Sequence, residues 1–197
     1  DRTIVFSTFQ DMNGRDVGGI YSKSTAWLME RIRTKEDYFM YYNSVGEGAV
    51  NDVYKTLSFA FVNGGYWKIN QFHFIEGRPF TEQECLNKDA YVVLREDMAG
   101  MFFKRESVVG KKMEIQGREY TVIGVVRNFP TYAIRADGIW IPHVFNSFSP
   151  RGFGYYDLGV LFPRDVPVQN MKEDVAVAVK DYWRQINMQV DVKPENL

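Results

Sequence analysis

The chain has few residues of the types that bind metals or cross-link proteins. Its 197 residues include one cysteine, Cys85, and two histidines, His73 and His143. A single cysteine cannot form an internal disulfide, and a protein without disulfides can live in an oxidising or a reducing compartment. A zinc site usually needs roughly three or four His, Cys or acidic ligands at close spacing. We therefore expect packed or surface histidines, and no metal or cofactor.

The chain also lacks a long apolar run and an excess of charge of either sign. No stretch approaches the ~20 apolar residues of a membrane helix, and no signal peptide is present. The net charge is −1 at pH 7, which argues against a nucleic-acid surface. The sequence starts with Asp1 rather than Met, so we expect a piece of a longer protein.

Aromatic residues, in contrast, are plentiful at 16%, which suits a packed mixed fold. A chain of this length forms one domain or two small ones and buries roughly 70% of its unfolded surface. Both ends alternate strands with helices. Strands are predicted at 3–9, 38–45 and 57–62, with a glycine-containing loop at 10–21 and with Gly46 and Gly48 ending the second strand. Helices are predicted from Ser22 or Ser24 to about 34 and from about 165 to 187.

The segment from Val109 to Val126 predicts a tight β-hairpin. Met113 and Ile115 alternate with polar residues, which is typical of a half-buried strand. Gly117 supplies the positive φ that a short turn requires. Gly124 interrupts the second, apolar strand and indicates a bulge or a close backbone approach. The surrounding block is β-rich, with one short helix near 95–104.

Motifs for catalysis are weak or incomplete. Gly110-Lys111-Lys112 lacks the earlier glycine and the following Ser or Thr of a phosphate-binding loop. Cys85 lies among acidic residues, which disfavour the thiolate of a nucleophile. The carboxylate pairs at 36–37 and 82–84 are typical of solvated loops. These observations argue against an enzyme.

A Gly-, Pro- and Ser-rich segment at 145–156 is unusually aromatic. Loops often carry function, and exposed aromatic residues mark interfaces. The same residues could instead fold back onto the core. The candidate partner or coupling residues in this loop are Phe145, Phe148, Phe153 and Tyr155.

Four segments in order resemble the extracytoplasmic core domain of MacB/FtsX-type ABC transporter permeases. They are the Glu76-Gly77-Arg78-Pro79-Phe80-Thr81 turn, the strand and short helix over 92–103, the 109–126 hairpin, and Ile139-Trp140-Ile141-Pro142. The chain departs from this pattern at Val108, where the family often has Pro, and at Asn128, where Asp is common. The motif residues to which the resemblance assigns a structural role are Gly77, Arg78, Phe80, Gly110, Lys111, Gly117 and Gly124.

The resemblance implies an α+β fold with two subdomains. A porter-like α/β layer would be formed by residues 1–72 and 146–197, and a β-rich Sabre-like subdomain by residues 73–145. The implied setting is the periplasmic or extracytoplasmic side of a bacterial inner membrane. The domain itself would not be an enzyme, and any ATP hydrolysis would belong to a separate nucleotide-binding domain or subunit.

The partners implied are a second copy of the permease, a cytoplasmic ABC ATPase and a periplasmic adaptor or chaperone, with the isolated domain a monomer. In that family, ATP-driven motion passes through the membrane to this domain without substrate crossing the bilayer. Two alternatives stay open: a domain that senses a ligand or peptide, and an enzyme of a type without a known motif. An apolar pocket with a few polar groups would favour the first.

Overall fold

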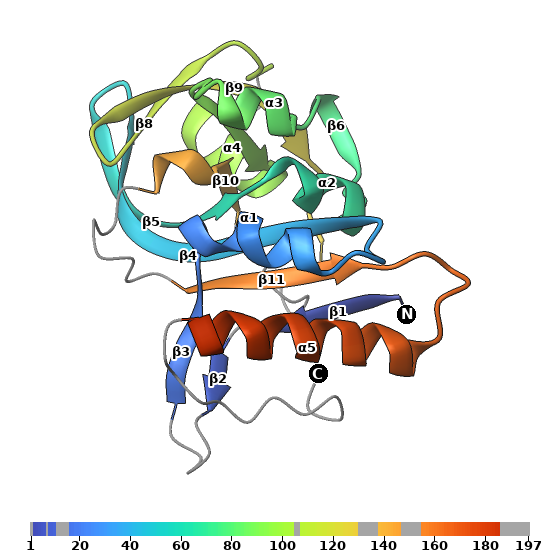
Figure 1. Ribbon diagram of the computed structural model, residues 1–197. Coiled ribbons are helices and arrows are strands. Elements are labelled where there is room, and N and C mark those ends of the chain that lie inside the picture. Colours follow the sequence, from blue (N-terminus) through green and yellow to red (C-terminus); the bar gives the residue numbers. More distant parts are fainter. Residues whose placement is uncertain are drawn as a thin grey trace. The chain divides into compact units, whose positions relative to one another are not determined.

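A computed structural model describes residues 2–6, 8–10, 16–104, 107–129, 138–146 and 155–185 (Figure 1). The chain forms two compact units. Unit 1 consists of residues 1–40 and 147–197, and unit 2 consists of residues 41–146. Strands and helices occur in both units, so the fold is α+β as the sequence predicts.

Unit 1 contains a small antiparallel sheet. Strand β11 (Tyr155–Leu161) pairs with both β1 (Thr3–Phe6) and β3 (Asp16–Tyr21), and β3 pairs with β2 (Thr8–Gln10). The sequence predicted a single strand over 3–9 and a loop through β3. That prediction was wrong because the glycines of β3 were interpreted as loop residues, whereas pairing with two neighbours holds them in a strand.

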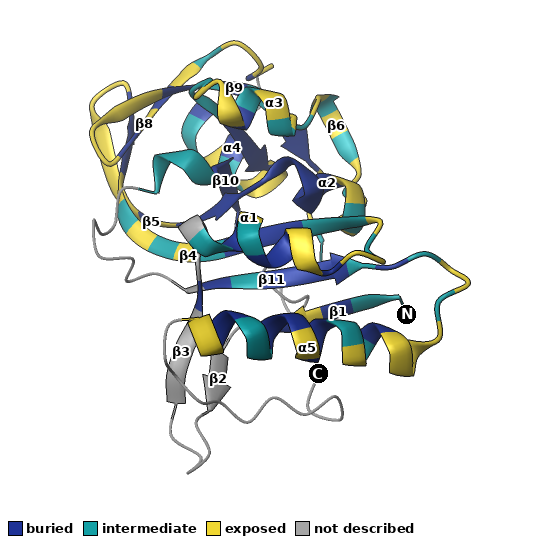
Figure 2. Cartoon of the chain, viewed as in Figure 1, coloured by how far each residue is buried: buried dark blue, intermediate teal, exposed yellow. Residues whose placement is uncertain are grey.

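Two amphipathic helices complete unit 1. They are α1 (Ser22–Arg31) and α5 (Val168–Gln185). The rings of Trp27 and Tyr182 lie 6.1 Å apart, so the two helices contact each other through aromatic side chains. One side of α5 is buried and the other exposed, as Figure 2 shows. The helix residues with less than 5% exposure include Leu28, Met29, Met171, Val175, Val179, Tyr182 and Trp183.

Unit 2 is built on a closed ring of six strands. In ring order they are β4 (Asp37–Val50), β5 (Val53–Val62), β10 (Ile139–Pro142), β7 (Tyr91–Arg95), β9 (Arg118–Val126) and β8 (Lys112–Ile115). Strand β4 enters the unit at Tyr41. The ring closes where β4 pairs with β8, with Gly48 opposite Ile115 and Ala49 opposite Glu114. The pairs β5–β10 and β7–β9 are parallel and the others antiparallel.

Shorter elements are attached to this ring. They are α2 (Gly64–Asn70), β6 (Phe74–Gly77), α3 (Glu82–Leu86), α4 (Glu96–Phe103) and the 3₁₀ turn η1 (His143–Phe145). The side chain of Trp67, on α2, lies at the centre of an aromatic cluster and is 6% exposed. Its ring centroid is 5.2 to 5.8 Å from those of Phe72, Phe74, Phe80 and Trp140.

Strand β4 is longer than the sequence predicts. Gly46 and Gly48 were expected to end it, but pairing with β5 continues through both to Val50. A Cβ on Gly48 would lie 2.4 Å from a side-chain carbon of Leu57. These glycines therefore allow close packing inside the strand.

The boundary between the compact units also differs from the expected subdomain boundary. The sequence assigned residues 41–72 to the terminal segments, whereas their contacts within the chain place them with residues 73–146. The reason is pairing at long range: β5 is hydrogen-bonded to β10, β4 pairs with β8, and Trp67 packs on Trp140.

Candidate functional site

Two of the motif glycines lie where strands β6 and β9 approach each other closely. Gly77 on β6 lies opposite Gly124 on β9. Gly77 has a φ of +64°, and a Cβ there would lie 2.0 Å from the carbonyl oxygen of Ile123. A Cβ on Gly124 would lie 2.4 Å from the carbonyl oxygen of Arg78. The close approach expected at Gly124 is confirmed, and the β7–β9 register also shifts beside it.

Arg78 stabilises the start of α3 through Glu84. Its guanidinium donates two hydrogen bonds to the Glu84 carboxylate, at 2.9 and 2.6 Å. The same carboxylate accepts the Thr81 backbone N–H, while the Thr81 hydroxyl accepts the Glu84 N–H, which completes a capping box. The sequence indicated Arg78 as a motif residue, but the carboxylates at 82–84 were interpreted as part of a solvated loop. The pairing of Arg78 with Glu84 was therefore missed, although Thr-x-x-Glu over 81–84 is a readable capping signal.

Phe80, between these polar residues, is a core anchor. Its side chain is 1% exposed, and its ring packs edge-on against Trp67. The turn from Gly77 to Thr81 therefore joins a close strand crossing, an ion pair and a buried ring within five residues. This arrangement is structural: it orders the chain between β6 and α3.

Gly110 and Lys111 lie in a turn that Glu76 holds in place. The Glu76 carboxylate accepts hydrogen bonds from the Ser107 hydroxyl and from the backbone N–H groups of Val108 and Val109. Burial alone would raise the pKa of Glu76, but these hydrogen bonds lower the pKa below its ordinary value.

The backbone of this turn is already paired. Gly110, with a φ of +88°, donates its N–H to the carbonyl of Val122, and Lys111 donates to that of Val108. A phosphate-binding loop presents such N–H groups to its ligand. Here they are used within the protein, so the turn offers no cradle for a nucleotide phosphate.

The hairpin turn joins β8 to β9 as predicted. Gln116 and Gly117 have φ values of 51° and 73°. Positive φ at both central residues is typical of a type I′ turn, the geometry that two-residue hairpins favour. A Cβ on Gly117 would meet nothing within 4 Å, so backbone conformation alone favours glycine there.

The aromatic loop is only partly described. Phe145 packs edge-on against Tyr120, with ring centroids 5.4 Å apart, and the guanidinium of Arg118 lies 4.7 Å from its ring. This phenylalanine therefore contacts its own unit. Phe148 and Phe153 lie outside the described residues. Tyr155 begins β11, where its backbone pairs with that of Tyr21.

Two titratable residues noted in the sequence, Cys85 and His143, lie among side chains that belong to the fold. Cys85 is fully buried, and burial, with help from Glu82 and Glu84, raises the pKa of its thiol to about 12. The imidazole of His143 lies 3.6 Å from the carboxylate of Glu82, which also accepts the N–H of Gly64 at the start of α2.

Neither a metal cluster nor a membrane helix is found in the part of the chain that the structure describes. No group of three His, Cys, Asp or Glu side chains there could hold a metal ion. None of its helices has the length and apolar character needed to cross a bilayer.

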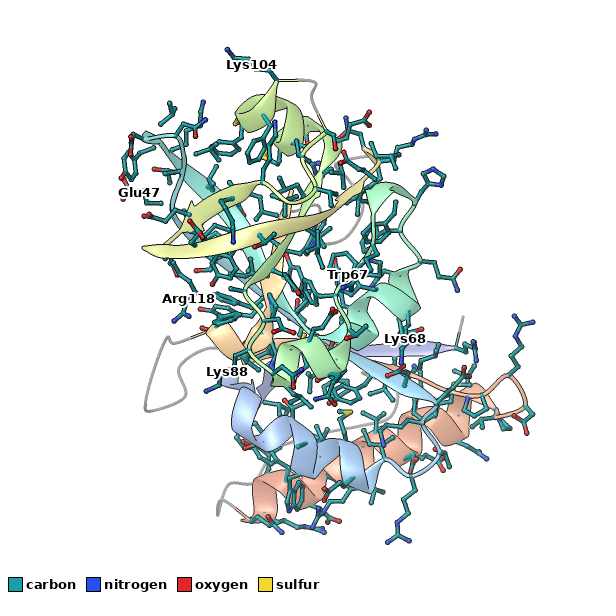
Figure 3. The ribbon with its side chains drawn as sticks, turned by 90° about the horizontal axis from the view of Figure 1, so that it is seen from above. Glu47, Trp67, Lys68, Lys88, Lys104 and Arg118 are labelled. Carbon is teal, nitrogen blue, oxygen red and sulfur yellow. The ribbon has the colours of Figure 1, made fainter. Side chains whose placement is uncertain are left out.

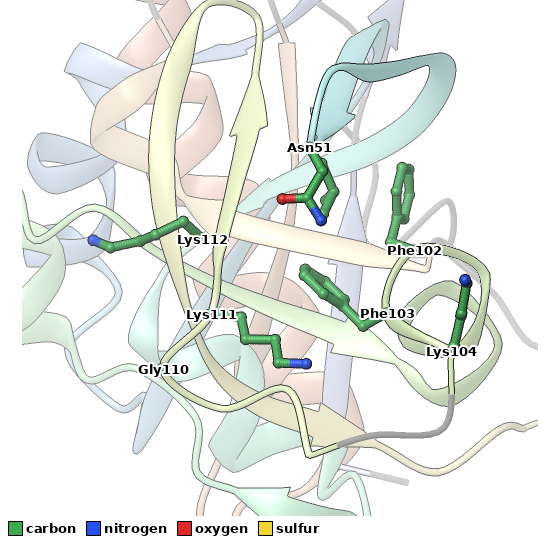
Figure 4. A pocket seen from close by; sticks show the side chains of 8 residues that line it. Asn51, Phe102, Phe103, Lys104, Gly110, Lys111 and Lys112 are labelled. Atoms are coloured by element: carbon green, nitrogen blue, oxygen red, sulfur yellow. The ribbon is translucent and has the colours of Figure 1, made fainter.

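The described residues of unit 2 line three surface hollows that the sequence did not predict. Their volumes are ≈ 460, ≈ 530 and ≈ 220 Å³. The first lies between the end of α4, the β4–β5 turn and the start of β8 (Figure 4). The second lies between α4 and β5, and the third at the β4–β5 turn. Their walls come from segments distant in sequence, so no local motif indicates them.

Solved structures with a similar fold include the following three domains. The periplasmic region of MacB from Actinobacillus actinomycetemcomitans superposes with a TM-score of 0.76 at 17% identity, over 92% of this chain and 84% of that one. The extracellular domain of the noncanonic ABC-type transporter YknZ from Gram-positive bacteria has a TM-score of 0.73 at 15% identity, over 95% and 100%. A domain of a putative permease from Porphyromonas gingivalis has a TM-score of 0.66 at 15% identity, over 97% and 86%.

Sequence comparison identifies the family. No curated protein sequence matches the chain. The model of the MacB-like periplasmic core domain, however, matches residues 6–193, which include almost all of both units. The motif residues at the β6–β9 crossing and in the hairpin have the structural roles described above. The chain belongs to the family of MacB-like periplasmic core domains, the periplasmic or extracellular part of ABC transporter permeases.

Proposed function

We propose that this domain couples motion driven by ATP in the cytoplasm to the handling of a substrate or partner outside the membrane. The observation that supports this role is the family match over residues 6–193, because it includes both compact units. The domain is then a mechanical and docking module, and it catalyses no reaction itself.

In this proposal the ATPase is a separate domain or subunit. The only sequence in the chain that resembles a phosphate loop, at 110–112, forms the turn in which the N–H groups of Gly110 and Lys111 are bonded to Val122 and Val108. The partners are a second copy of the permease, a cytoplasmic ABC ATPase, and an adaptor or chaperone on the outer side. The isolated domain is expected to be a monomer that does not bind nucleic acid.

We also propose which compact unit corresponds to which subdomain of the family. Unit 1 corresponds to the porter-like α/β layer and unit 2, with its strand ring, to the Sabre-like subdomain. The first boundary then falls after Met40 instead of after residue 72, following the contacts within the chain.

The aromatic loop at 145–156 is the proposed coupling or partner segment. The test is the double change Phe148→Ala and Phe153→Ala in the intact permease. We expect transport to fall while ATP hydrolysis and folding stay near normal, because aromatic side chains at a contact surface provide area with few rotamers to restrict.

A matched control for this test is Tyr54→Ala, since Tyr54 is 54% exposed on β5. This control should leave transport unchanged. Normal transport in the double variant would rule out a coupling role for the loop. Unfolding of the double variant would show that the two rings belong to the core.

A further inference from the structure

Strand β5 has an open edge over the first part of its length. Along one edge it pairs with β4 from Val53 to Val62. Along the other edge it pairs with β10, but only over residues 60–62. No strand in the described part of the chain pairs with this second edge over residues 53–59. An unpaired edge is a template on which a strand from another chain can form.

The strand register shows which backbone groups face the open edge. A two-residue turn joins Val50 to Val53, and the residues that flank such a turn are hydrogen-bonded to each other. Bonding alternates along a strand, so the odd-numbered residues of β5 bond to β4 and the even-numbered residues face the other edge. The N–H and C=O of Thr56 therefore point to the open edge, where the described part of the chain gives them no partner.

The open edge borders a hollow in the surface of unit 2. We call this hollow the β5 groove; it is lined by residues 55–58 of β5, by Met98 and Met101 of α4, and by Arg95 and Gly138. Its volume is ≈ 530 Å³, within the roughly 300–1,000 Å³ that is usual for binding sites. Met101 is 48% exposed. Because methionine side chains adapt to different partners, α4 gives the groove an adaptable apolar wall.

The β5 groove also carries one unmatched positive charge. Leu57 and Phe59 are buried, and Lys55 lies on the same face of β5 because strand side chains alternate. The Lys55 ammonium has neither a hydrogen bond nor an ion pair in the described part of the chain. Arg95, in contrast, donates two hydrogen bonds of 2.7 Å to the Asp97 carboxylate. The described residues that line the groove include no acidic side chain, so an acidic ligand would complement Lys55.

This charge argues against a second copy of the chain as the occupant. Symmetric pairing of two copies through this part of the edge would bring their Lys55 side chains onto one face, opposite or diagonal to each other. Like charges in such positions destabilise strand pairing. A peptide that carries Asp or Glu would instead gain an attraction at the same position.

We propose that the β5 groove binds an extended, acidic peptide segment of a partner protein, which adds to β5 as a further strand. The peptide backbone bonds to the N–H and C=O of Thr56. Its alternate side chains point into the groove, where apolar residues contact Met98 and Met101 and an Asp or Glu lies beside Lys55. The proposal goes beyond the coupling role and is tested without transport, so the failure of either one leaves the other standing.

The binding test starts from a displayed library of random peptides, selected on the immobilised 197-residue chain. Peptides of about twelve residues extend well past the groove at ~3.3 Å per residue. We expect the enriched peptides to alternate apolar residues with others and to include an Asp or Glu. The enriched peptides are then synthesised, and calorimetry with backbone NMR should show saturable binding with shifts in the amides of residues 55–58 and 98–101.

The first variant removes the backbone donor at the edge. Thr56→Pro deletes the N–H that faces the groove but no hydrogen bond to β4, and it should weaken peptide binding about tenfold or more. Thr56→Val is the matched control, because it keeps the N–H and should bind as the parent does. Urea unfolding of both variants checks that the fold is retained.

The second variant removes the positive charge. Lys55→Gln should weaken binding of an acidic peptide about threefold, the loss typical of an exposed ion pair. The same change should have no effect on a peptide whose acidic residues are replaced by Asn or Gln. Lys88→Gln is the control, because Lys88 is also an exposed lysine. Figure 3 shows Lys88 far from Lys104, which follows α4.

A third arm changes the peptide instead of the protein, so it does not depend on how a variant folds. In an added strand, alternate residues bond to β5 and the others face away from it. N-methylation of one alternate set of peptide residues should abolish binding, and N-methylation of the other set should preserve it.

Four results would overturn the proposal. They are the absence of enriched peptides, amide shifts confined to residues outside the groove, normal binding by Thr56→Pro, and equal loss of binding for the two N-methylated peptides. A parent chain that dimerises in solution, and whose dimer Thr56→Pro abolishes, would likewise overturn it by showing that a second copy occupies the edge.

Discussion

The Glu84 carboxylate faces the Arg78 guanidinium across two hydrogen bonds, at 2.6 and 2.9 Å. This pairing, with the N–H and hydroxyl of Thr81, lowers the pKa of Glu84 to about 2. The ion pair thus connects the turn after β6 to the first turn of α3.

The first prediction concerns the pH dependence of stability. A carboxyl whose pKa is lowered on folding stabilises the protein above the pKa of the unfolded chain, and this contribution is lost as pH falls toward the folded value. For Glu84 the window runs from about 4.5 to about 2. Urea unfolding should show Glu84→Gln less stable than the parent at pH 7. The difference should narrow through this window; a constant difference would contradict the assignment.

The second prediction concerns the glycines of the β6–β9 crossing. Gly124→Ala places a Cβ 2.4 Å from the carbonyl oxygen of Arg78, where strand pairing resists movement. We expect a loss of roughly 1–3 kcal/mol in the free energy of unfolding, as is typical when a buried site is overpacked. Gly100→Ala is the control, because its Cβ would meet nothing within 4 Å. On α4 that change should be neutral or stabilising.

The third prediction separates backbone conformation from crowding. Gly117→Val should destabilise the chain by at least ~1 kcal/mol, because a β-branched residue is strained at positive φ. Gly117→Asn should cost less, since Asn tolerates this conformation. The open space around Gly117 means that the comparison measures φ alone. Equal denaturation midpoints for all three proteins would show that the turn is unimportant for stability.

The fourth prediction concerns the thiol of Cys85. Burial raises its pKa to about 12, so at pH 8 almost none of the native protein carries the reactive thiolate. A thiol reagent such as DTNB should therefore react slowly with the folded chain and rapidly after unfolding in urea. Fast reaction in the native state would mean that the α3 region opens frequently.

Local features of the fold could be predicted from the sequence. The hairpin at Gly117 and the helix α5 each carry a complete pattern in a short segment, and both were predicted. β3 was missed because its glycines mimic a loop. The end of β4 was predicted too early because Gly48 was interpreted as the residue that ends the strand. In the structure Gly48 allows Leu57 to pack closely on the strand.

Long-range features could not be predicted in this way. The pairing of Gly48 with Ile115 closes the ring in unit 2, yet nothing near either residue indicates the other. The boundary of the compact units after Met40 follows from long-range pairing, and it differs from the subdomain boundary expected after residue 72. The hollow at the end of α4 could not be predicted for the same reason, since Asn51, Lys104 and Lys111 come from three separate segments.

The closed ring determines where the chain can be truncated without exposing strand edges. A fragment of residues 73–145 would keep β7, β8, β9 and β10 but lose β4 and β5, two adjacent strands of the ring. Its sheet would then have two bare borders, along β8 and along β10, each with unpaired backbone groups able to recruit another chain. Such a fragment would tend to self-associate, whereas a fragment that starts at Tyr41 keeps the part of β4 that pairs with β5 and β8, and with it the closed ring.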